Sequence, residues 1–162
     1  MIQFVLQKIQ ERKEAEEKLR ESEEKYRLLH DNSPNSVLLI DMGGRIIDCN
    51  KTAELLSKFK RNELVGHHLA SLSAIHPAHI PELANAMKRL FKERVTVDGE
   101  IILLDKEKVP MWCYYSSSIV KINGEDTIQI IFQNINDKKI AEERLRASER
   151  KYRYLLRNLL ML

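Results

Sequence analysis

The feature that most constrains this chain is a direct repeat of its own sequence near its two ends. Residues 2–29, IQFVLQKIQERKEAEEKLRESEEKYRLL, align without a gap with residues 128–155, IQIIFQNINDKKIAEERLRASERKYRYL, and 16 of the 28 aligned pairs are identical. A charged helix alone recurs often by chance, but the apolar segment in front of it does not. The fixed offset of 126 residues therefore indicates one unit of a repeating array.

The composition fits one ordinary domain with flanking segments. The 162 residues are 43% hydrophobic and 31% charged, and the net charge is only +3. No apolar run approaches the roughly 18–20 residues of a membrane span, and no signal peptide is evident, so we expect a cytoplasmic segment without membrane contact. Lysines and arginines alternate with glutamates, which indicates a solvated helix face and no nucleic-acid partner.

The residue types that carry chemistry are sparse. The two cysteines, Cys49 and Cys113, lie far apart without a CxxC motif, which argues against a disulfide scaffold or a zinc site. No Ser/His/Asp set, phosphate-binding glycine loop or pair of carboxylates has a suggestive spacing. We therefore predict that this segment is not an enzyme.

Apolar runs and turn residues between the two repeats predict an antiparallel sheet with helices on one face, an α+β fold. Pro34 ends a charged helix, and two pairs, Gly43-Gly44 and Asn123-Gly124, mark hairpin turns. A helix is predicted over residues 81–92. The predicted strands cover residues 37–41, 45–49, 99–104, 109–117 and 127–135.

Three segments in this order, LLIDMGGRIIDCNKTAELL, RNELVGHHL and IHP, resemble a PAS domain of the S-box type. The later segment FQNINDKKIAEERLRASERKYR is similar to that family's passage from its last strand into a signalling helix. The resemblance implies a five-stranded PAS fold in a sensory signal-transduction protein such as a sensor histidine kinase. It also implies a small molecule or cofactor between the sheet and the central helices.

The resemblance also suggests what the repeated segments are. Residues 1–9 would be the last strand of a preceding PAS domain, residues 10–30 a linker helix, residues 31–135 the PAS core, and residues 136–162 a signalling helix that runs into a following domain. The neighbours of this unit in the parent chain would then be further PAS or kinase domains.

The junction between the last strand and the signalling helix departs from the family pattern. Asn134, Ile135 and Asn136 stand where the family usually has Asp-Ile-Thr. We expect Asn136 to cap the helix and Ile135 to anchor it to the sheet, with no carboxylate at residue 134. In the turn before the fourth strand, Glu107 stands where glycine is typical, which predicts a turn of another type or a slightly strained one.

Two residues are candidates for binding a cofactor. His79 lies in PAHIPEL, which resembles the helix that carries the proximal histidine of haem-binding PAS sensors, although Pro81 would place His79 at the poorly fixed helix start. Trp112 lies on the strand that flanks the flavin ring in flavin-binding relatives. The alternatives are a surface histidine and ordinary sheet packing. We expect neither cofactor, so the ligand stays unknown.

Two further sets of residues are predicted from their positions. The flanking helices are expected to form the seam of a parallel homodimer, the alternative being that they fold back over the sheet; the seam residues are Leu19, Tyr26, Leu145 and Tyr152. The side chains expected around the pocket are Leu39, Ile46, Met87, Ile102, Tyr114, Ile130 and Phe132.

Two function classes follow. In the first, the segment senses a small molecule or cofactor in its pocket and passes the change through the flanking helices to a histidine kinase. In the second, it is a ligand-free spacer that mediates dimerisation and relay. Polar groups that point into the pocket favour the first class, and a core closed by apolar side chains favours the second.

Overall fold

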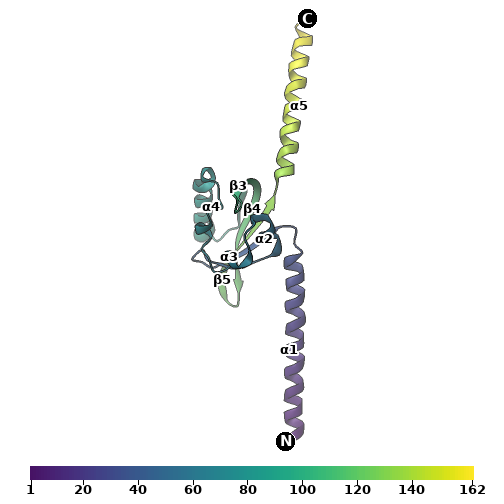
Figure 1. The fold of residues 1–162 in the computed structure, drawn as a ribbon, viewed down its shortest axis with the longest axis vertical. Coiled ribbons are helices and arrows are strands. Elements are labelled where there is room, and N and C mark those ends of the chain that lie inside the picture. Colours follow the sequence, from purple (N-terminus) through teal and green to yellow (C-terminus); the bar gives the residue numbers. More distant parts are fainter.

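Two long helices leave a small α+β core in opposite directions in the computed structural model, which describes residues 1–162 (Figure 1). Helix α1, Ile2–Asp31, precedes the core, and helix α5, Asn136–Leu160, follows it. The core elements are β1 Ser36–Ile40, β2 Ile46–Cys49, α2 Lys51–Ser57, α3 Arg61–Leu64, η1 Leu69–Leu72, η2 Pro77–His79, α4 Ile80–Glu93, β3 Val97–Leu104, β4 Pro110–Ile122 and β5 Glu125–Asn134.

The five strands form one antiparallel sheet in the order β2-β1-β5-β4-β3. Strand β5 therefore lies between the first and the fourth strand, with Phe132 opposite both Ser36 and Tyr115. The β4–β5 hairpin turns at Asn123 and Gly124, whose φ angles of 51° and 81° are those of the tight turn expected for this pair. The predicted five-stranded sheet is confirmed.

The helices of the core cover one face of the sheet. On that face Ile40, Ile101 and Tyr115 are at most 2% exposed, and Leu90 of α4 is fully buried against them. Full burial of side chains of this size contributes about 1.5–3 kcal/mol each to folding. The opposite face of the sheet carries no helix of the core.

Residues 2–9 differ from the sequence-based expectation, because they form the first turns of α1 and not a strand. A strand leaves its backbone N–H and C=O groups unpaired when the neighbouring strands are absent, whereas a helix pairs them within the segment. The repeated sequence thus takes two conformations in this chain: residues 128–134, its second copy, belong to β5.

Asn50 ties the end of α1 to the sheet. Its side chain is 1% exposed and uses all four of its hydrogen-bonding positions. The Oδ1 atom accepts from the N–H groups of Val37 and Ala53 at 2.9 and 3.0 Å. The Nδ2 atom donates to the carbonyl oxygens of His30 and Asn35 at 2.9 and 2.8 Å. A single side chain therefore caps α2, fixes the start of β1 and holds the last turn of α1.

The turn between β3 and β4 is organised by Asp105. Its Oδ1 atom accepts from the N–H groups of Glu107 and Val109, both at 2.9 Å, and its Oδ2 atom lies 2.9 Å from Lys58 Nζ. Lys108 and not Glu107 takes the positive φ, 63°, so the turn is of a different type from a glycine turn at residue 107, as expected.

We expect Asp105→Asn to make the free energy of unfolding less dependent on pH under acidic conditions. The hydrogen bond from Lys58 holds the pKa of Asp105 below its usual value. A carboxylate with a lowered pKa stabilises the fold fully above its unfolded pKa of about 3.9, and this contribution is lost as the pH falls through the lower folded value. In urea unfolding between about pH 6 and pH 2.5, the free energy of unfolding should therefore fall more steeply with decreasing pH in the parent chain than in the variant. An equal slope of the free energy of unfolding against pH in both chains would contradict this prediction. The control is Glu149→Gln, which changes an exposed carboxylate of α5.

Candidate functional site

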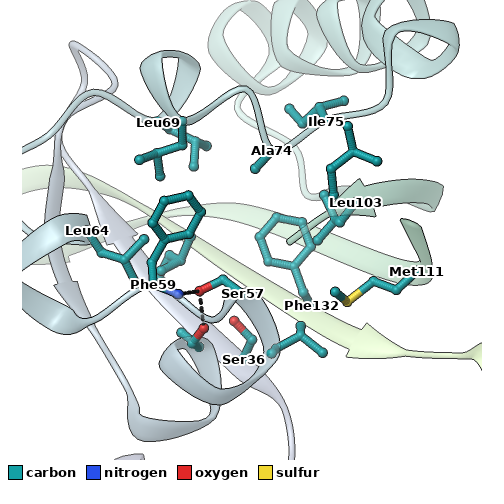
Figure 2. A pocket seen from close by; sticks show the side chains of 15 residues that line it. Ser36, Ser57, Phe59, Leu64, Leu69, Ala74, Ile75, Leu103, Met111 and Phe132 are labelled. Atoms are coloured by element: carbon teal, nitrogen blue, oxygen red, sulfur yellow. Dashed lines mark hydrogen bonds between the residues drawn. The ribbon is translucent and has the colours of Figure 1, made fainter. Parts of the chain in front are cut away.

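An apolar cavity lies between the sheet and the short helices that cover it (Figure 2). Its volume is about 50 Å³, and 13 of its 15 lining residues are hydrophobic, so it does not favour a charged occupant. The lining residues come from β1, α2, α3, η1, the segment before η2, β3, β4 and β5: Ser36, Leu38, Ala53, Leu56, Ser57, Phe59, Leu64, Leu69, Leu72, Ala74, Ile75, Leu103, Leu104, Met111 and Phe132.

Of the seven residues predicted around the pocket, Phe132 lines the cavity. Ile46 and Ile130 belong to the hydrophobic core on the same side of the sheet, and the partly buried Met87 packs against that core; all three lie outside the lining. The remaining three require a correction, because they lie on the opposite face of the sheet: Leu39, Ile102 and Tyr114.

The cause of that error is the two-residue period of a strand. Leu38 and Leu103, the immediate neighbours of two mispredicted residues, line the cavity, and Tyr115 is buried in the core beside Tyr114. Since successive side chains alternate between the two faces, a shift by one residue exchanges inside and outside. Tyr114 instead donates a hydrogen bond from its hydroxyl to Asp98 at 2.7 Å.

His79 and Trp112 lie together outside the cavity. Their rings meet edge to face with centroids 5.6 Å apart, at the edge of the sheet where η2 passes into α4. Neither residue lines the cavity, and a volume of about 50 Å³ is far smaller than a haem or a flavin ring system. The residues around the cavity therefore do not fit either cofactor.

Trp112 holds the first turn of α5. Its carbonyl oxygen accepts from Ile135 N at 2.9 Å, and its own N–H donates to Asn136 Oδ1 at 2.8 Å. The Lys139 ammonium lies 4.6 Å from the centroid of the indole ring, a cation–π contact. Lys139 also pairs with Glu100, and that hydrogen bond lowers the pKa of the Glu100 carboxyl.

The junction residues are arranged differently from the expectation in one respect. Ile135 is 6% exposed and occupies the N-cap position, while Asn136 is the first helical residue and turns its side chain to β4. Asn134 takes the predicted role of Asn136, because its Oδ1 atom accepts from Asn136 N at 2.9 Å. The side chain of Asn136 turns away from the helix because it accepts a hydrogen bond from the N–H of Trp112, which no neighbouring strand reaches.

The predicted seam residues are exposed on two helices that point away from the core (Figure 1). Leu19 and Tyr26 are 59% and 52% exposed, and Leu145 and Tyr152 are 61% and 67% exposed. The flanking helices therefore do not fold back over the sheet. The structure brings neither pair of residues into contact with the cavity.

Residues that the sequence analysis missed include Asn50, Lys139 and the two serines of the cavity. Asn50 follows a predicted strand and precedes the run KTAELL, which is rich in helix-forming residues, so its capping role could have been found from the sequence. The stacking of Lys139 on Trp112 could not, because it joins residues from separate elements. The chain contains no group of three or more His, Cys, Asp or Glu side chains that could hold a metal ion, and no helix long and apolar enough to cross a membrane.

The antiparallel sheet, the helices on one of its faces and the small internal cavity define a class of sensory domain. The sequence profile described as "PAS domain" matches residues 34–137, which is more than half of the chain. The chain belongs to the PAS domain family. PAS domains are sensory modules and not catalytic domains.

The chain is also similar to individual kinases and PAS domains. Sporulation kinase E of Bacillus subtilis is 27% identical over 145 residues, which are 90% of this chain and 19% of that protein. The chain thus spans about a fifth of the length of this curated relative. The PAS domain of an HTR-like protein from Haloarcula marismortui superposes with a TM-score of 0.65 at 19% identity, over 76% of this chain and 99% of that one. A sensory box histidine kinase/response regulator from Burkholderia thailandensis gives 0.60 at 16% identity, over 80% of this chain and 98% of that one.

Proposed function

We propose that this chain is the sensing and relay module of a larger signal-transduction protein of the histidine kinase type. A small molecule in the cavity would bias the position of α5, which leads to the next domain. The observation that carries the proposal is the adjacency of two β4 residues: the side chain of Met111 lines the cavity, and Trp112 holds the first turn of α5.

A second connection runs along the edge of the sheet. Ala74 and Ile75 line the cavity, and the segment that contains them pairs with β3 through hydrogen bonds from Leu104 N to Ala74 O at 2.7 Å and from His76 N to Ile102 O at 2.9 Å. The same segment continues to His79, whose ring contacts Trp112. A molecule that displaces this wall of the cavity would therefore act on the residue beneath α5, and a ligand shifts such an equilibrium by its differential affinity for the two positions.

The repeat and the kinase relative support a proposal for the place of the module in its parent. The match to sporulation kinase E covers 90% of this chain, and the 126-residue repeat supports a tandem array in a cytoplasmic sensor kinase. In that array residues 2–9 would join the sheet of a preceding PAS domain, and the chain from Tyr152 onward would begin a following one.

The ligand-free spacer stays a second candidate because of one observation. The exposed apolar side chains of α1 and α5 need a partner, and a homodimer through both helices would cover them. Such a dimer suits a rigid relay as well as a sensor. The two functions differ in whether a molecule bound in the cavity changes the position of α5.

We expect Trp112→Leu to loosen α5 from the sheet and to uncouple the parent kinase from its stimulus. The variant keeps an apolar side chain but removes the ring that Lys139 and His79 contact. A cation–π contact contributes about 1 kcal/mol, so amide exchange of residues 138–145 should become about five- to tenfold faster. Hydrogen exchange on the isolated chain and phosphorylation by the full-length parent, with and without stimulus, measure the two effects.

Tyr114→Leu is the matched control, because Tyr114 lies two residues further along the same face of β4. Its hydroxyl donates a hydrogen bond to Asp98, and it has no hydrogen bond or cation–π contact with α5 of the kind that Trp112 makes, so exchange of residues 138–145 should keep the parent rate. Equal exchange and equal output in the two variants would mean that the junction is a passive linker, and the spacer function would then replace the sensor.

A further inference from the structure

The cavity lining contains a serine whose hydroxyl makes no hydrogen bond to the protein. Ser36, the first residue of β1, is 3% exposed and belongs to the cavity lining. In Figure 2 its hydroxyl lies beside Ser57 and Phe132 without a hydrogen bond to either. The fully enclosed polar atoms without a partner lie elsewhere, at His30 Nε2, Ser117 Oγ and Asp126 Oδ1, so the Ser36 oxygen stays open to the cavity space. The other serine is already satisfied: Ser57 donates to Ala53 O at 2.6 Å and accepts from Phe59 N at 3.3 Å. Ser36 is therefore the only free hydrogen-bonding side chain in an otherwise apolar cavity.

A free hydroxyl in such a place costs free energy that a suitable occupant recovers. A hydroxyl that faces apolar side chains and has no protein partner is satisfied only by what enters the cavity, and it can act both as a donor and as an acceptor. A molecule with one polar atom and an apolar remainder would satisfy Ser36 and fill the space among the leucine and phenylalanine side chains. A molecule with a formal charge would not, because no charged side chain lines the cavity.

The volume limits the size of the occupant. A buried water needs about 10–15 Å³ on this scale, so a cavity of about 50 Å³ has room for the equivalent of three or four water molecules. A compact organic molecule of roughly three to five non-hydrogen atoms matches this space. Larger ligands would have to displace the leucines of η1 or the helices that carry them.

We propose that the ligand of this domain is a small uncharged molecule with an apolar body and one hydroxyl or carbonyl oxygen, which hydrogen-bonds to Ser36. The class comprises short-chain alcohols and ketones. The inference rests on the proposed sensing function and names the chemistry that the cavity selects. Ser36 is the specificity-determining residue, because the rest of the lining contributes only shape and apolar contact.

The test uses 1-propanol as the probe and the amide and methyl NMR signals of Ser36, Leu38 and Met111 as the readout. Ligands of this size bind weakly, and a saturable Kd of about 1 mM is expected. Propanoate, which has a similar size and a negative charge, should cause no saturable shift at concentrations up to about 100 times that value. 1-Propanethiol fills the same space but is a poor hydrogen-bonding partner, so it reports the apolar contribution alone.

Ser36→Ala keeps the cavity open and removes the hydroxyl. It should weaken binding of 1-propanol about five- to tenfold and leave binding of 1-propanethiol within about twofold, because one hydrogen bond is lost in one case only. Ser57→Ala is the matched control in the same lining, and it should leave the preference for the alcohol intact. Ala74→Leu fills the cavity and should abolish the shifts, with its fold checked by circular dichroism and thermal unfolding.

Four results would overturn the proposal: no saturable binding of 1-propanol, tight binding of propanoate, an equal affinity of the parent and Ser36→Ala for 1-propanol, or shifts that persist in Ala74→Leu. These outcomes are separate from the relay. Failure of 1-propanol to bind, together with a changed output in Trp112→Leu, would remove this ligand class and leave the sensing function. Binding as described, with no effect of Trp112→Leu, would leave the ligand class and remove the relay.

Discussion

Asn50→Asp is expected to destabilise the domain by about 3 kcal/mol and to lower its melting temperature by at least about 12 °C. The carboxylate would keep the two acceptor contacts but would lose both donors and face the carbonyl oxygens of His30 and Asn35. Two buried acceptors would then lack a partner, and each such loss costs about 1–3 kcal/mol. Thermal unfolding monitored by circular dichroism at pH 7 measures the effect.

The pH dependence of that deficit gives a second check. A carboxyl group held against two carbonyl oxygens favours its protonated form, so its folded pKa would be raised and the deficit would shrink as the pH falls toward 4. Asn62→Asp makes the same chemical change at an exposed position of α3 and should stay within about 0.5 kcal/mol of the parent. A melting temperature of Asn50→Asp equal to that of Asn62→Asp would show that the Asn50 contacts contribute nothing to stability.

The double variant Leu19→Asp/Leu145→Asp is expected to convert a dimer into a monomer. Both leucines are more than half exposed in the single chain, and burial of a leucine in an interface contributes about 1.5–3 kcal/mol. A parallel homodimer buries two copies of each, and the variant replaces them with carboxylates that face one another. The dimer dissociation constant should rise at least roughly a thousandfold, measured by light scattering and analytical ultracentrifugation.

The repeat supplies a matched control for this experiment. Leu28 and Tyr154 are separated by the same 126 residues, are 64% and 66% exposed, and lie nine positions after the two seam residues, which places them on the far side of each helix. Leu28→Asp/Tyr154→Asp should therefore stay dimeric. The seam prediction is wrong if the parent chain and the Leu19/Leu145 variant have the same monomeric mass.

The strands and their pairing were accessible from the sequence because their signals are local. The pair Asn123-Gly124 permits only a tight turn between two β-branched runs, and the structure has a hairpin there. The start of α2 after Asn50 is equally local, since an asparagine side chain caps the helix that follows it. These elements need no knowledge of the rest of the chain.

The inward face of the sheet could not be predicted in the same way. On β4 both faces carry large side chains, with Trp112 and Tyr114 on one and Cys113 and Tyr115 on the other. Alternation separates the two sets but does not tell which one the helices cover. The predicted pocket followed the wrong set on three strands, and the placement of the helices settles the choice.

The sequence by itself determined the α+β class and the approximate strand boundaries, because each depends on neighbours within a few positions. Only the tertiary structure decided that Ser36 and Phe132 share a cavity, that Asn50 clamps α1, and that Trp112 lies beneath Lys139. These contacts join residues from 20 to 96 positions apart in the chain. Their geometry depends on how the short helices pack on the sheet. The free energy of packing is distributed over many side chains, and no single side chain shows in the sequence which residue it will contact.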